Sequence, residues 1–316
     1  MPITTRLIAS IVVLLGLICL ASFLRHRGVL KEEHGGVFAG LVTQVTLPAL
    51  IFVSLATTSI EWGEAWLALI MLGAELVALG LGWVAATMLR MERPAKGAMI
   101  LVSGFGSSSL LGYALISQVF PGNTGAMTEA VVVSEIGVGP ALFTLGTMIA
   151  IYYGKEEAGP DARIRAALEF FRSPIFISVV AGLFWTVFGL PSTGPVMGTI
   201  MQGLQVAGEA NTLMVALLVG VLLKFSGIGS VALAGVLVAL NKLILKPVMI
   251  WLPTLPMTLP VWEVHVLVLE AAMPSALLTV ALSRSYGCDA GLASRMVFFT
   301  TVLSAVSIPV MFQLLR

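Results

Sequence analysis

Five glutamates lie inside long apolar stretches of the sequence, where ionisable side chains are costly and usually functional. They are Glu75, Glu129, Glu135, Glu209 and Glu270. A carboxyl group in such surroundings can bind a proton and carry it across a membrane. We expect the groups that couple transport to an ion to be among Glu135, Glu209, Asn211 and Glu270. The alternative is that each glutamate only bridges neighbouring helices.

Two segments place helix-weakening residues and hydroxyl groups in the middle of apolar runs. The first is GFGSSS at residues 104–109, and the second is EAAMPSA at residues 270–276. Proline clashes with the preceding helical turn and glycine weakens a helix, so both segments predict interruptions. Helices that resume near Ser109 and Ser275 would point free N–H groups toward the middle of the membrane. Each such end carries roughly half a positive charge, which favours an anion.

These two interruptions predict a binding site for an anionic substrate. Its candidate residues are Gly106, Ser107, Ser108, Ser109, Met273, Pro274 and Ser275. The alternative is that the small residues only permit close helix packing and that Pro274 is an ordinary kink. Because paired interruptions in corresponding helices mark the central site of many transporters, we prefer the substrate site.

Two lysines lie in another apolar run, near its end. Lys242 and Lys246 are four residues apart and therefore share one face of a helix. They could pair with a carboxylate or attract an anion from outside. We expect instead that Lys246 extends its ammonium group to the outer surface beside Pro247.

The composition identifies the class of protein that holds these groups. Of 316 residues, 58% are hydrophobic and 10% are charged, and the mean hydropathy is +1.03. Soluble domains have about 25% charged residues, so we expect a multi-pass helical membrane protein. A formal net charge of +1 gives no basic face for nucleic acid. The histidines, cysteines and carboxylates form no metal-binding pattern, and no nucleophile motif or phosphate loop is present. We therefore expect no cofactor and no enzymatic activity.

Apolar stretches of about 20 residues, the length that spans a bilayer, predict ten transmembrane helices. Their approximate ranges are 5–24, 35–57, 65–89, 97–120, 126–153, 172–190, 195–223, 228–250, 260–283 and 291–314. One clearly polar connection, residues 154–171, separates a first half (1–153) from a second half (172–316) with five helices each. An odd number of helices per half inverts the second half. The expected fold is therefore all-α, a 5+5 inverted repeat with discontinuous helices 4 and 9.

The orientation follows from the basic residues. Most of the 17 Lys and Arg residues lie in the odd-numbered loops, whereas the even-numbered loops contain none. Because basic loops stay in the cytoplasm, we expect both termini on the outer side of the cell (inner) membrane.

Residues 271–311, AAMPSALLTVALSRSYGCDAGLASRMVFFTTVLSAVSIPVM, closely resemble the ninth and tenth helices of the auxin efflux carrier family. The shared features are the Met-Pro pair, an acidic residue in a short turn and a Ser/Thr-rich run that ends in proline. The resemblance implies a fold similar to that of the bile acid/sodium symporters, in which helices 4 and 9 are unwound and cross at the centre. It also implies secondary transport of organic anions.

The fourth helix departs from the pattern of that family, which runs roughly Asn-Thr-Gly-x-x-Gly-x-Pro. Here Ser107–Ser109 replace Asn-Thr-Gly, Gly112 matches, and Ala114 replaces the proline. Set against the resemblance, this departure implies either an altered specificity or a relaxed first crossover.

We expect a secondary active transporter that moves a small organic anion, such as a carboxylate, by alternating access and with proton coupling. Sodium coupling is the alternative, because Ser, Thr and Asn oxygens lie near both interruptions. A channel or sensor with the same broken helices is a further alternative. The expected partners are the carboxylate, H+ or Na+, and the lipid bilayer, without nucleic acid. The sequence leaves open whether the transporter works as a homodimer.

Overall fold

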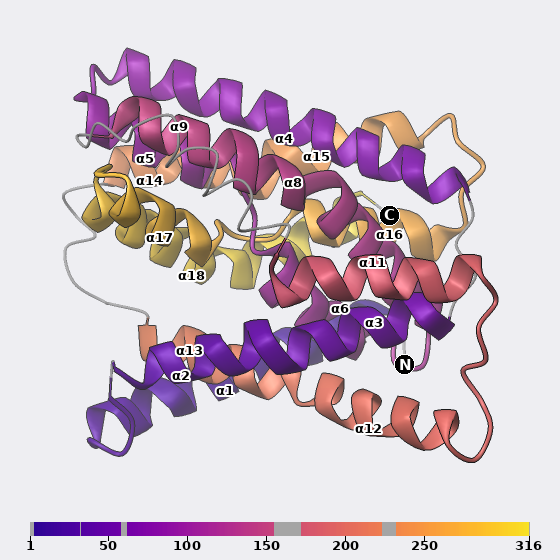
Figure 1. Ribbon diagram of the computed structural model, residues 1–316. Coiled ribbons are helices and arrows are strands. Elements are labelled where there is room, and N and C mark those ends of the chain that lie inside the picture. Colours follow the sequence, from indigo (N-terminus) through magenta and orange to yellow (C-terminus); the bar gives the residue numbers. More distant parts are fainter. Residues whose placement is uncertain (1–2, 32, 58–61, 155–171, 223–231, 316) are drawn as a thin grey trace. The chain divides into compact units, whose positions relative to one another are not determined.

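The computed structural model describes residues 3–31, 33–57, 62–154, 172–222 and 232–315 (Figure 1). In this part of the chain the regular structure is entirely helical, apart from one isolated backbone bridge. The predicted polar connection, beyond Gly154, lies outside the described residues.

Six of the described helices are long and apolar enough to cross a membrane. They are Thr5–His26, His34–Thr57, Trp66–Met88, Met197–Val221, Leu233–Thr254 and Ala290–Leu314. These correspond to predicted helices 1, 2, 3, 7, 8 and 10. Two further apolar helices, Thr144–Tyr153 and Pro174–Val187, are shorter. The prediction of a helical multi-pass membrane protein is thus supported, whereas the arrangement of ten helices in two repeats stays a prediction.

Large apolar side chains are exposed along several of these helices. Val12 is 62% exposed, Trp66 57% and Val306 68%. Exposed apolar surface on this scale is unfavourable in water but is the expected surface of a helix that faces lipid.

The helices pack into two compact units, and each unit combines segments from both halves of the sequence. Unit 1 comprises Met1–Glu64, Ser109–Glu135 and Phe171–Leu223, and unit 2 comprises Ala65–Ser108, Ile136–Phe170 and Lys224–Arg316. The units are defined by which helices are in contact, whereas the predicted halves 1–153 and 172–316 are defined by their order in the sequence. The division into units therefore does not test the predicted halves, which stay a prediction.

Unit 1 is built around two helices. Its elements are α1 (Ile3–His26), α2 (His34–Leu41), η1 (Val42–Thr46), α3 (Leu47–Thr57), α6 (Tyr113–Val119), α7 (Thr124–Val131), α11 (Pro174–Val187), α12 (Met197–Glu209) and α13 (Asn211–Leu222). Helix α3 packs against α7, α11 and α12, and α1 packs against α6 and α13 (Figure 1). Side-chain caps begin two of these helices: Asn123 accepts the N–H of Ala126 at 3.1 Å, and Ser173 accepts that of Phe176 at 3.1 Å.

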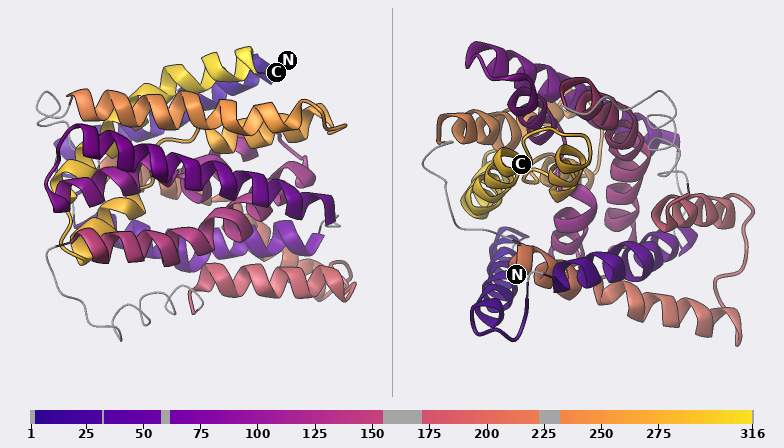
Figure 2. Two further views of the ribbon diagram at one scale, coloured as in Figure 1. Left: turned by 90° about the horizontal axis from the view of Figure 1, so that it is seen from above. Right: turned by 60° about the vertical axis from the view of Figure 1, so that its left-hand side comes forward.

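Unit 2 is built around the last helix of the chain. Its elements are α4 (Trp62–Met88), α5 (Arg93–Gly104), α8 (Gly139–Ala141), η4 (Leu142–Gly146), α9 (Thr147–Tyr153), α14 (Ala232–Leu240), η6 (Asn241–Leu245), α15 (Lys246–Thr254), α16 (Val261–Ala271), α17 (Leu277–Ser285) and α18 (Ala290–Leu314). Helix α18, yellow in Figure 2, packs against α5, α14, α16 and α17. Asp289 caps it by accepting the N–H of Leu292 at 2.9 Å.

Several helices contain π-helical turns, including η2 (Ser108–Gly112), η3 (Val132–Val138) and η6. Such turns are rare and occur frequently at functional sites. Here η2 directly follows the first predicted interruption, η3 contains Glu135, and η6 contains Lys242.

Candidate functional site

Both predicted helix interruptions are present. Helix α5 ends at Gly104, and the chain becomes helical again at Ser108 with η2. Helix α16 ends at Ala271, and α17 begins at Leu277. In both places the sequence explains the break: Gly104 and Gly106 weaken the first helix, and Pro274 cannot continue the second.

The two interrupted segments, which both belong to unit 2, pair with each other through their backbones. Gly106 and Ser275 form an isolated antiparallel bridge. The N–H of Ser107 donates to the carbonyl of Pro274 at 2.8 Å, and the N–H of Ala276 donates to the carbonyl of Phe105 at 3.0 Å. Unpaired backbone groups are too costly to leave in an apolar environment, so each interruption stabilises the other.

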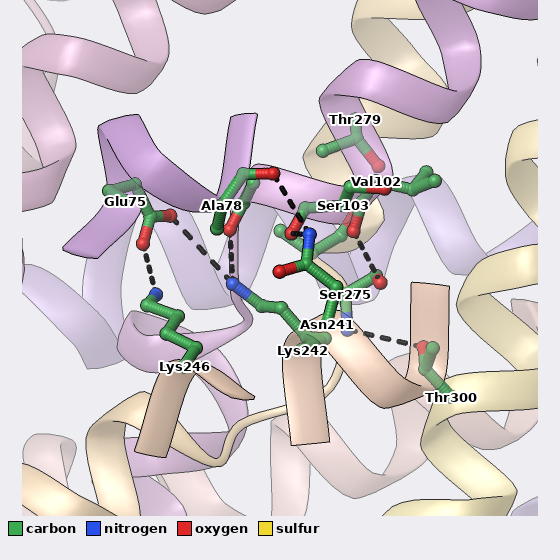
Figure 3. A network of polar contacts seen from close by, with 12 residues as sticks. Glu75, Ala78, Val102, Ser103, Asn241, Lys242, Lys246, Ser275, Thr279 and Thr300 are labelled. Atoms are coloured by element: carbon green, nitrogen blue, oxygen red, sulfur yellow. Dashed lines mark hydrogen bonds and ion pairs between the residues drawn. The ribbon is translucent and has the colours of Figure 1, made fainter. Parts of the chain in front are cut away.

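The serines at the crossover differ in what they bind. The Ser275 hydroxyl donates to the carbonyl of Val102 at 2.7 Å, and its N–H donates to Thr300 Oγ1 at 3.2 Å (Figure 3). Ser107 is only 4% exposed, and its hydroxyl has no hydrogen-bond partner among the described residues. Ser108 is also buried. Ser275 therefore holds the two segments together, whereas the Ser107 hydroxyl forms no hydrogen bond among the described residues.

The second interruption contains two further residues that were predicted to bind the substrate. Met273 is 1% exposed and Pro274 is buried. Glu270, one turn earlier on α16, is 1% exposed. The crossover thus brings Gly106, Ser107 and Pro274–Ser275 together, with Glu270 close by in the chain.

A fully buried charged cluster adjoins the crossover. Glu75 on α4 forms an ion pair with Lys246, and its Oε1 atom lies 3.8 Å from Lys242 Nζ (Figure 3). All three side chains are 0% exposed. The expectation that Lys246 extends to the outer surface was wrong: the carboxylate of a neighbouring helix offers a closer partner. Of the alternatives weighed from the sequence, pairing with a carboxylate is the one that the structure contains.

Residues of η6 also bind backbone carbonyl groups of two other helices. Lys242 Nζ donates a short hydrogen bond to the carbonyl oxygen of Gly104, the last residue of α5. Asn241 Nδ2 donates to the carbonyl of Ala78 at 2.9 Å. A Cβ atom on Gly106 would lie 3.0 Å from Lys242 Nζ, so the backbone and the ammonium group are in close contact. Both lysines were singled out from the sequence, but their position beside the crossover was not predicted.

In unit 1, Glu135 binds two hydroxyl groups. Its Oε1 accepts from Ser109 Oγ at 2.5 Å and from Tyr113 Oη at 3.0 Å. Glu135 is 4% exposed and Tyr113 0%. One predicted coupling residue is therefore bonded to one predicted substrate residue. Tyr113 was missed, although its spacing of four residues from Ser109 places both on one helix face.

The other two coupling candidates of unit 1 have different surroundings. Glu209 is exposed, accepts from Gln205 Nε2 at 3.2 Å, and lines an open cavity of about 410 Å³ between α3, α7 and α12. Asn211 is 1% exposed, and its Oδ1 accepts from Thr46 Oγ1 at 2.9 Å. Among the described residues Glu209 and Glu135 share no hydrogen-bond partner: Glu209 bonds to Gln205, and Glu135 bonds to Ser109 and Tyr113.

Comparison with known proteins relates the chain to one family. Residues 6–312 match the family described as Membrane transport protein. An uncharacterized transporter of Methanocaldococcus jannaschii is 24% identical over 311 residues, which is 97% of this chain and 96% of the relative. An uncharacterized transporter of Methanothermobacter thermautotrophicus is 28% identical over 309 residues, or 97% and 96%. The range matched by the family, residues 6–312, spans both helix interruptions and the charged cluster of this chain.

Proposed function

The chain belongs to the membrane transport protein family, the auxin efflux carrier family that residues 271–311 resemble, and we propose that it is a secondary transporter of a small organic anion. It would move a carboxylate across the cell membrane by alternating access. The protein would act as a carrier and not as an enzyme.

The observation that carries the proposal is the pairing of two broken helices in one unit. Helices that begin at Ser108 and Leu277 have N-terminal N–H groups without helical partners, and these ends favour negative charge. The Ser107 hydroxyl adds a buried donor that is free among the described residues. A carboxylate could accept from this hydroxyl and from the N–H groups of the new helix.

Two features favour the finer architecture, a 5+5 inverted repeat. The segments around Gly106 and Ser275 occupy corresponding places in the two halves and run antiparallel, as a two-fold axis through the crossover requires. Predicted helices 4 and 9 are each interrupted near the middle, at residues 105–107 and 272–276. We therefore propose ten membrane-crossing segments, with the odd-numbered loops in the cytoplasm and both termini outside.

Proton coupling is the form of energy coupling that the buried acids favour. Glu135 binds two hydroxyl groups and has no ion-pair partner among the described residues. Because Ser109 is both its donor and a candidate substrate residue, a proton on Glu135 and a substrate would act on the same hydroxyl group. Glu270 beside the second interruption is the next candidate. Glu209 is less suited, since its carboxylate is exposed and pays little for staying charged.

A ligand screen followed by a transport assay tests this proposal. The melting temperature (Tm) of the purified protein is measured with mono- and dicarboxylates, neutral analogues and cations at constant ionic strength. We expect carboxylates to raise Tm, and the best of them to show saturable uptake and counterflow in proteoliposomes. Stabilisation by neutral solutes alone would refute the anion site. Conductance far above the turnover of a carrier would indicate a channel.

A further inference from the structure

A buried ammonium group lies at the C-terminal end of α5, and neither the proposed substrate site nor the proposed proton carrier uses it. Lys242 Nζ donates to the carbonyl oxygen of Gly104. It also lies 3.8 Å from Glu75 Oε1 (Figure 3). The side chains of Lys242 and Glu75 are both 0% exposed. This ammonium group therefore bonds to the end of a helix that stops in the middle of an apolar run.

The oxygens around Lys242 Nζ are those that would bind a monovalent metal cation. The last carbonyls of a helix have no N–H partner and carry the negative end of the helix dipole. Here Gly104 supplies such a carbonyl, and Glu75 adds a carboxylate. Carbonyl rings bind alkali cations in membrane channels, and carboxylates are ligands of hard cations generally. A positive charge at this point offsets both groups.

The backbone is shaped closely around the ammonium group. A Cβ atom at position 106 would lie 3.0 Å from Lys242 Nζ and 3.1 Å from its Cε. Because Gly106 has no side chain, the ammonium group of Lys242 fits beside the paired segments. On the other side of the carboxylate, Lys246 pairs with the second oxygen of Glu75. Glu75 thus keeps one partner when Lys242 is absent.

We infer that Lys242 is a tethered cation: its ammonium group fills a monovalent-cation site formed by the Glu75 carboxylate and the Gly104 carbonyl. Because the lysine is covalently attached, its effective concentration at the site is high and no free cation can compete. Because it cannot leave, it cannot be cotransported either. The crossover therefore has its own positive charge, and sodium has no site there in the wild-type protein.

Removing the side chain should expose the site to free cations. The Tm of purified Lys242→Ala is measured in N-methyl-D-glucamine, sodium, potassium and methylammonium chlorides at one ionic strength. We expect a lowered Tm in N-methyl-D-glucamine and a saturable rise with methylammonium or sodium, about 2–4 °C at roughly four times the dissociation constant. The wild-type Tm should be the same in all four salts. Lys242→Ser, which adds an oxygen to the vacated site, should show the same rise.

Two controls distinguish the site from general effects of salt. In Lys246→Ala, Lys242 still fills the site, so Tm should not depend on the cation. In the double variant Glu75→Gln/Lys242→Ala, the carboxylate is lost and the recovery should disappear. A wild-type Tm that rises selectively with sodium would overturn the inference. So would the absence of a cation-specific rise in both Lys242→Ala and Lys242→Ser. The readout is protein stability, so the result does not depend on the proposed anion substrate.

Discussion

Gly106 and Ser275, which come from opposite halves of the sequence, lie opposite each other in an isolated antiparallel bridge. The bridge joins two helix interruptions, and hydrogen bonds from Ser107 to Pro274 and from Ala276 to Phe105 flank it. Each half of the sequence therefore supplies backbone partners that the other half needs within the membrane.

Substitution of Gly106 by alanine should destabilise this crossover. The new Cβ would lie 3.0 Å from Lys242 Nζ and 3.6 Å from the carbonyl oxygen of Met273. Lys242 is buried and bonded, so its end cannot move aside freely. Overpacking of this kind costs about 1–3 kcal/mol, and we expect a lower Tm together with reduced transport.

The matched control is Gly80→Ala, an exposed glycine of α4 in the same unit. A Cβ at position 80 would meet no atom within 4 Å. Alanine is also the better helix former, so this variant should be at least as stable as the wild type. Equal stability of Gly106→Ala and Gly80→Ala would contradict the close contact at the crossover.

Ser107→Ala should weaken substrate binding without destabilising the protein. Its buried hydroxyl has no partner among the described residues, so its removal leaves no other group unsatisfied. A hydrogen bond to a charged ligand contributes about 1.5–3 kcal/mol, or roughly 10- to 100-fold in affinity. Titration of the stabilising carboxylate measures the change. Ser103→Ala, another buried serine of unit 2 that faces Gly82, is the control and should bind normally.

Glu135→Gln should abolish uptake driven by a pH gradient but preserve exchange of substrate across the membrane. The glutamine oxygen can still accept from Ser109 and Tyr113, so the local structure should persist, whereas the amide cannot carry a proton. Proteoliposomes with an imposed pH gradient measure the first property and counterflow the second. Glu209→Gln, at an exposed position, should retain both. Uptake by Glu135→Gln that still follows the pH gradient would assign Glu135 a structural role.

Cys288 in the turn before α18 should react slowly with thiol reagents. Burial, and next the negative charge of Asp289, raise the pKa of its thiol to about 11 from an ordinary value of 9.0. The reactive thiolate is therefore about 100-fold scarcer near neutral pH than for an unperturbed thiol. In a Cys19→Ser background, the rate of alkylation should rise steadily between pH 7 and 10. It should also rise at fixed pH in Asp289→Asn, because the charge is lost and the helix cap is kept. Labelling at pH 7 as fast as in the unfolded protein would contradict this prediction.

The helix interruptions could be predicted from the sequence because their causes are local. Pro274 and the glycines around Phe105 weaken a helix whatever surrounds them. The uninterrupted apolar helices were predicted for the same reason, since about 20 apolar residues in succession suffice. The pairing between the interruptions is not local. The expectation of corresponding breaks in two halves suggested it, and the resemblance to the auxin efflux carrier family implied that the two helices cross.

The partners of charged side chains could not be predicted in this way. Lys246 was expected at the surface because its position near a helix end and beside Pro247 is typical of a snorkelling lysine. Its partner, Glu75, is far away in the sequence and comes close only through packing of α4 against the segment that follows α14. Likewise Glu209 and Glu135 both lie in apolar runs, and only the fold distinguishes the exposed carboxylate from the buried one.

The hydrogen bond between Ser109 and Glu135 joins the two ends of one segment of unit 1. The segment Ser109–Glu135 belongs to unit 1, and the residues on either side of it, Ser108 and Ile136, belong to unit 2. One bond between its first and last residues closes this segment at its base. The two ends of the segment are therefore tied to each other, and a proton carried by Glu135 would change the bond that ties them.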